Sequence, residues 1–144
     1  MSNPPPVPRP FLHPLHGLLL AFPVALFVAA LLGDIAYLKT VEMQWSNFAS
    51  WHLVGALVFG GFTLLWALIL AIMRRHTPIG RRARIYAVVL AGMWLAGLAN
   101  AFQHSRDAWS SVGMPGFTLS LVSACLALVA GWIAHGPIRE IARS

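Results

Sequence analysis

Residues 13–38 read HPLHGLLLAFPVALFVAALLGDIAYL, and this stretch decides the fold class. At about 1.5 Å per residue, a helix of this length can cross the hydrocarbon core of a bilayer, which is about 30 Å thick. Proline suits the first position of a helix, so Pro14 predicts that His13 lies at the N-cap. Asp34 is the one carboxylate of the stretch, and a carboxylate at such depth needs a partner or a function.

Three more apolar runs follow, and together they predict spans at about residues 14–38, 48–73, 85–104 and 117–135. Short connections make neighbouring helices antiparallel. We therefore expect an all-α, integral membrane four-helix up-down-up-down bundle over residues 13–136. It follows a proline-rich extended or disordered tail at residues 1–12 and precedes a cytoplasmic tail at residues 137–144.

The composition is that of a membrane protein. Apolar residues make up 58% of the 144 residues and charged residues 10%, against about 25% charged in soluble domains. The net charge of +6 comes from basic residues between the apolar runs, so we expect no nucleic-acid partner. Cys125, the one cysteine, excludes an internal disulfide and is expected to be a small buried packing residue.

The basic residues predict the orientation in the membrane. If both termini face the cytoplasm, that side carries eight arginines and the other side only Lys39 and Arg106, which agrees with the positive-inside rule. Tyr86 and Trp132 would then lie at the inner interface. The arginines between the second and third spans are expected to meet anionic lipid headgroups: Arg74, Arg75, Arg81, Arg82 and Arg84.

Ionisable residues on the outer side form one candidate site. His52 and His104 lie at similar depths on neighbouring helices, which is an arrangement that can hold a b-type haem through both axial positions. Asp34 and Asn100 would lie beside them as cofactor-binding residues. Small residues would leave room for the macrocycle: Gly55, Gly97 and Ala101.

The same residues allow a structural interpretation. Histidines near a membrane boundary are often wetted interfacial side chains, or they make hydrogen bonds within the protein. Asp34 would then pair with His52, His104 or Arg106 to avoid the cost of an unpaired charge in hydrocarbon.

On the inner side, His13, His16 and His135 form a candidate metal site for zinc or copper with an open coordination position. In the alternative interpretation, His13 caps its helix, His16 faces headgroups and His135 interacts with the C-terminus of its own helix.

The opening His13-Pro14-Leu15-His16, with Phe22-Pro23 and the late Asp34, resembles the family of bacterial predicted membrane proteins called domain of unknown function 2231. The closing segment 130–136 resembles the last helix of that family. The resemblance implies a four-helix protein of the bacterial inner membrane, often associated with respiratory or periplasmic redox proteins, with no assigned activity. Members often carry a histidine near the start of the third helix, where this chain has Arg84-Ile85-Tyr86.

Two functions remain open from the sequence. One is a non-catalytic accessory or anchor subunit of a membrane complex, favoured because no catalytic or phosphate-binding motif is present. The other is a redox module that binds b-type haem or interacts with quinone, and that transfers electrons between a membrane or periplasmic partner and the quinone pool. A transporter would require oligomerisation, with Asp34 as the proton carrier.

Overall fold

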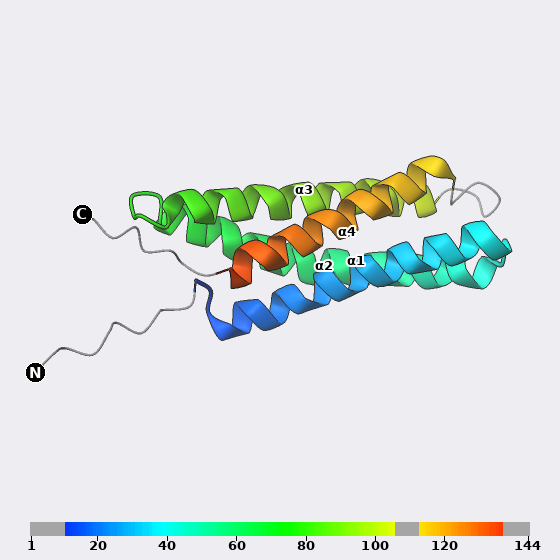
Figure 1. Cartoon of the computed structure of the whole chain (residues 1–144), viewed down its shortest axis with the longest axis horizontal. Coiled ribbons are helices and arrows are strands. Elements are labelled where there is room, and N and C mark those ends of the chain that lie inside the picture. The colour runs from blue at the N-terminus through cyan, green and yellow to red at the C-terminus, as the bar shows by residue number, and fades with distance from the viewer. Residues whose placement is uncertain (1–10, 106–112, 137–144) are drawn as a thin grey trace, which may run out of the picture.

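The computed structural model describes residues 11–105 and 113–136, and four helices account for nearly all of them. The helices are α1 (Pro14–Thr40), α2 (Met43–Met73), α3 (Gly80–His104) and α4 (Met114–His135) (Figure 1). Residues 1–10 and 137–144 of the predicted tails lie outside the described residues, as does Arg106.

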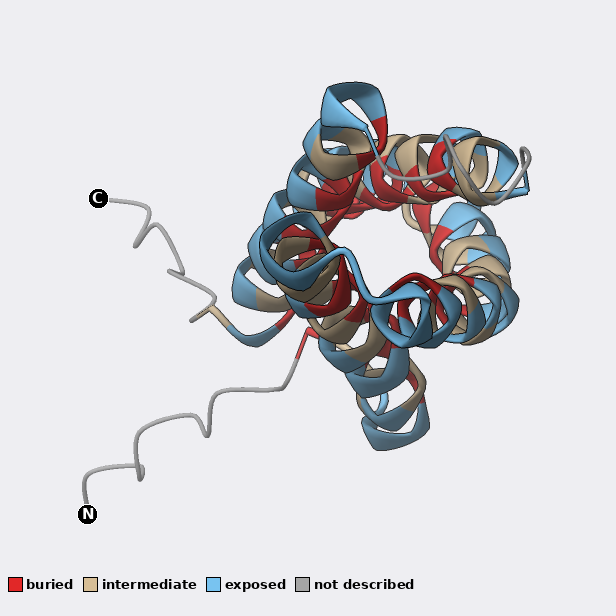
Figure 2. Cartoon of the chain, turned by 90° about the vertical axis from the view of Figure 1, so that its right-hand side faces the viewer, coloured by how far each residue is buried: buried red, intermediate tan, exposed pale blue. Residues whose placement is uncertain are grey.

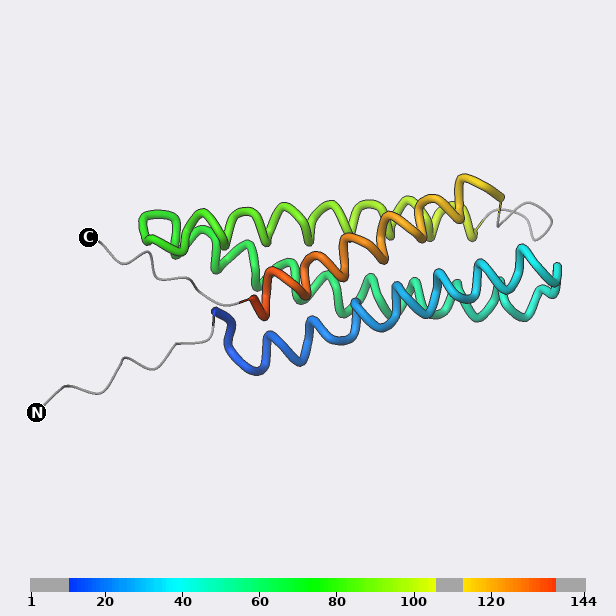
Figure 3. The backbone as a smooth tube through the Cα atoms, viewed as in Figure 1, coloured from blue at the N-terminus to red at the C-terminus, as the bar shows by residue number. Residues whose placement is uncertain are grey.

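Consecutive helices run in opposite directions, as the backbone trace shows (Figure 3). Each helix packs against the next, and α4 packs against α1, so the four close into a bundle. The prediction of an all-α four-helix bundle is confirmed. The start of α1, the link between α2 and α3, and the end of α4 all lie at one end of the bundle (Figure 1). We call it the arginine end.

Local sequence explains how α1 begins. His13 is the N-cap, its Nδ1 accepts a hydrogen bond from the Leu15 backbone N–H at 3.2 Å, and Pro14 occupies the first helical position. Val41 ends the helix with φ 59°, a left-handed conformation that a residue other than glycine rarely adopts. α2 begins at Met43, before the expected span, because its polar first turns can be helical outside the hydrocarbon.

The buried residues line the inward side of the helices, and the exposed residues face outward (Figure 2). Most of the buried apolar side chains are alanines, packed with larger ones such as Phe27 and Leu90, and large apolar side chains cover the outside. Fully buried positions include Ala30, Ala56, Ala67, Ala127 and Ala130. Alanine and glycine let the helix backbones approach closely, which is the main packing device between helices in lipid. All four helices are long and apolar enough to cross a membrane.

The expectation that Cys125 is buried is wrong, because this side chain is exposed on α4. Its neighbours Ser123 and Ala124 take the inward positions on that turn of the helix. The apolar run is equally apolar on both sides of the helix, so its sequence does not reveal which residues face inward.

Candidate functional site

Four polar side chains from three helices, all of them buried, meet near the end of the bundle opposite the arginine end (Figure 1). His104 Nε2 lies 2.9 Å from Asp34 Oδ1, and Ser120 Oγ donates a hydrogen bond to Asp34 Oδ2. Asn100 Nδ2 donates to Ser120 Oγ at 2.6 Å, and His104 Nδ1 lies 3.1 Å from the Asn100 backbone oxygen. These hydrogen bonds form a closed loop, which we call the polar ring.

The polar ring fixes how many protons the Asp34–His104 pair holds. A backbone carbonyl only accepts, so His104 Nδ1 must carry a hydrogen and donate it to the Asn100 oxygen. One further proton then lies between His104 Nε2 and Asp34 Oδ1, bonded to either atom. The pair has no net charge in either form, which avoids placing an uncompensated charge in the membrane.

The sequence predicted part of this ring. Asp34 pairs with His104, one of the three partners expected for it, and Asn100 shares the inward face of α3 with His104. Ser120 was not predicted. Its signal was a small hydroxyl in an apolar run, a residue type that often makes hydrogen bonds between membrane helices. Asn100 Oδ1 is buried and has no hydrogen-bond partner among the described residues.

His52 does not belong to the polar ring. Its Nδ1 lies 2.7 Å from the Phe48 backbone oxygen, and its ring lies against the Phe48 side chain, so both contacts are within α2. His104 uses both ring nitrogens inside the polar ring. Axial ligation of a haem by His104 would therefore require it to release Asp34 or the Asn100 oxygen.

Two of the three small residues expected to make room for a macrocycle, Gly55 and Gly97, instead make room for side chains of α1. A Cβ atom added at Gly97 would lie 2.5 Å from two atoms of the Phe27 ring, and one added at Gly55 would lie 3.1 Å from Leu26. Phe27 is fully buried. Gly97 thus lets α1 and α3 pack around an aromatic ring.

A second polar contact lies toward the arginine end. His16 Nε2 and the Tyr86 hydroxyl are 2.8 Å apart, and both side chains are buried. Trp66 packs edge-on to His16 with ring centroids 5.3 Å apart. Within the described part of the chain, His16 Nδ1 is buried without a hydrogen-bond partner. The expectations that Tyr86 lies at the interface and that His16 faces headgroups are therefore wrong, because the two side chains turn inward to each other.

The three histidines of the candidate metal site each have a protein partner. His13 caps α1, His16 contacts Tyr86, and His135 Nδ1 lies 2.9 Å from the Gly131 backbone oxygen. His135 approaches α1, because its Nε2 is 4.0 Å from the Cβ position of Gly17. Over residues 11–105 and 113–136, no three His, Cys, Asp or Glu side chains form a group that could hold a metal ion.

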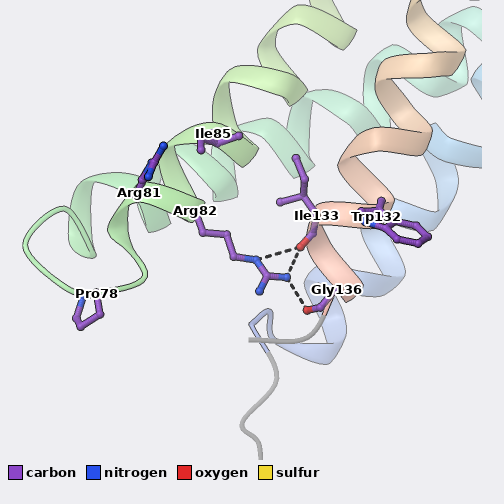
Figure 4. A pocket seen from close by; sticks show the side chains of 7 residues that line it. All are labelled: Pro78, Arg81, Arg82, Ile85, Trp132, Ile133 and Gly136. Carbon is purple, nitrogen blue, oxygen red and sulfur yellow. Dashed lines mark hydrogen bonds between the residues drawn. The ribbon is translucent and has the colours of Figure 1, made fainter. Parts of the chain in front are cut away.

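Arg82 joins the start of α3 to the end of α4 (Figure 4). Its Nε donates to the Ile133 oxygen at 3.2 Å, and its Nη2 donates to the Gly136 oxygen at 2.6 Å. The guanidinium carbon also lies 4.5 Å above the Phe11 ring. A cation at these carbonyls complements the negative end of the α4 dipole.

Comparison with known proteins places the chain in a family. The sequence model described as "Predicted membrane protein (DUF2231)" matches residues 12–136. The chain belongs to the DUF2231 family. The matched region covers all four helices and the polar ring, so the suspected resemblance is confirmed and this DUF2231 protein is a membrane protein. No curated protein and no solved structure matches the chain.

Proposed function

We propose that this protein is a non-catalytic accessory or anchor subunit of a complex in the bacterial inner membrane, with both termini in the cytoplasm. The observation that carries the proposal is the polar ring. Asp34, the carboxylate buried within the helices, satisfies both of its oxygens with side chains of α3 and α4. A carboxylate whose two oxygens are both bonded to other helices stabilises the helix arrangement, whereas a carboxylate that acts on a substrate needs an oxygen free to contact it.

The second contact supports the same function. His16 and Tyr86 join α1 to α3 at the other end of the interior, and Arg82 joins α3 to α4. Polar contacts thus connect α1, α3 and α4 at both ends of the bundle. The outside of the four helices is covered with large apolar side chains that can face lipid or another membrane subunit.

The test is purification of the tagged chain from its own membranes in a mild detergent, followed by native electrophoresis and protein identification. An accessory subunit should co-purify with one dominant membrane complex in a fixed ratio, and its deletion should lower the abundance of that complex. A chain that always migrates alone, and whose deletion leaves every membrane complex unchanged, would contradict the proposal.

The second candidate is the redox module, and the Asp34–His104 pair favours its quinone form. The pair holds one proton that can lie on either partner, which is the kind of group that could supply or accept a proton at a quinone. Proton exchange with a quinone would need only a transient opening of the buried ring, whereas haem ligation by His104 would replace one of its hydrogen bonds for as long as the haem is bound.

The test of the redox module is an oxidised and a dithionite-reduced visible spectrum, with iron and quinone analysis of the purified protein. A reducible Soret band at one haem per chain, lost in both His52→Ala and His104→Ala, would establish the haem form. Bound quinone at one per chain, lost in Asp34→Asn, would establish the quinone form. The absence of both signals from protein purified from its own membranes would rule out the redox module.

A further inference from the structure

A cleft of about 480 Å³ opens at the arginine end between the start of α3 and the end of α4. Figure 4 shows its walls, with Arg82 reaching across from α3 to the α4 carbonyls. It is an open groove at the surface of the bundle rather than an enclosed cavity. The lining residues are Pro78, Arg81, Arg82, Ile85, Trp132, Ile133 and Gly136.

We propose that this cleft binds one anionic phospholipid, with the phosphate at Arg81 and an acyl chain against Ile85 and Trp132. The order of the lining residues along the bundle carries the inference. Arg81 and Gly136 lie at the end of the bundle, whereas Ile85 and Trp132 lie one helical turn further inward on their helices. Such a change from charged to apolar matches a headgroup followed by an acyl chain.

Exposure and charge agree with this occupant. Arg81 is exposed, so its guanidinium can reach a phosphate, and Trp132 is 82% exposed and offers an apolar ring to a chain in the bilayer. Arg82 adds a second positive charge, held in place by its bonds to α4. The sequence places three further arginines nearby, and clusters of basic residues at a membrane surface attract anionic lipids.

The experiment compares the full-length protein in nanodiscs or detergent with added phosphatidylglycerol and phosphatidylcholine. Native mass spectrometry counts the retained lipids, and thermal unfolding measures the stabilisation. We expect one tightly retained phosphatidylglycerol per chain. Arg81→Gln should weaken its binding about fivefold, as expected for one basic residue near an anionic surface. Trp132→Ala should weaken it as well, while leaving the arginines unchanged.

Arg84→Gln is the matched control, because Arg84 is also exposed on α3 but does not line the cleft. It should change the binding less than twofold. Equal losses in Arg81→Gln and Arg84→Gln would overturn the proposal, as would equal retention of phosphatidylcholine. Stabilisation by inorganic phosphate alone would show an anion site without a lipid and would also overturn it.

Discussion

Replacing Asp34 with asparagine tests whether the hydrogen bonds of the polar ring or the charge of its carboxylate stabilises the bundle. In Asp34→Asn, the side-chain oxygen can still accept from Ser120, and the amide can donate to Nε2 of a neutral His104 whose Nδ1 keeps its bond to the Asn100 oxygen. Every bond of the ring has a counterpart in the variant. We expect the free energy of unfolding to fall by less than about 1 kcal/mol.

Asp34→Ala removes both bonds and leaves His104 Nε2 and the Ser120 hydroxyl without their hydrogen-bond partner. A hydrogen bond between membrane helices contributes about 0.6 kcal/mol on average and up to about 1.7 kcal/mol. Two such losses amount to about 1–3 kcal/mol. The assay is reversible unfolding in mixed micelles, followed by circular dichroism, with the exposed carboxylate variant Glu42→Ala as control. If Asp34→Asn is as unstable as Asp34→Ala, the ring depends on a carboxylate charge and the reasoning is refuted.

Three further predictions concern packing, a buried hydrogen bond and the orientation in the membrane. Gly97→Ala should lose about 1–3 kcal/mol of stability in the unfolding assay, because its Cβ would lie 2.5 Å from a buried ring. Gly92→Ala, whose Cβ would make an ordinary 3.5 Å contact, should lose none, and equal losses would contradict the packing. Tyr86→Phe should lower the midpoint of thermal unfolding by removing the partner of a buried histidine, whereas Tyr37→Phe should not. Thr77→Cys, in a chain whose native cysteine has been replaced, should react with an impermeant thiol reagent only after the inner membrane is opened. Labelling of intact spheroplasts would show that the orientation is opposite to the predicted one.

The sequence predicts the fold well because the main signal is simple. Four long apolar runs separated by short polar links leave few arrangements for an antiparallel bundle. The pairing of Asp34 with His104 was also accessible, because a buried carboxylate needs a partner and the chain has few ionisable residues to offer.

The errors on α4 share one physical cause. That helix is apolar on nearly all sides, so periodicity does not tell which side of it faces inward. Cys125 was expected inside and lies outside, and Ser120 was missed for the same reason. Tyr86, on the more polar α3, was placed at the interface by its residue type and depth instead, and it lies inside. Gly97 showed that α3 has room on one face, but the sequence could not show that Phe27 fills it.

The structure implies above all that the buried polar residues hold the helices together as one ring. A double-mutant cycle of Asp34→Ala and His104→Ala, read as free energies of unfolding in mixed micelles, measures whether the two side chains act as a unit. We expect a coupling energy of about 0.5 kcal/mol or more, with the double variant clearly less destabilised than the sum of the single variants. Losses that add within about 0.3 kcal/mol would mean that the two side chains act independently, and would contradict the ring.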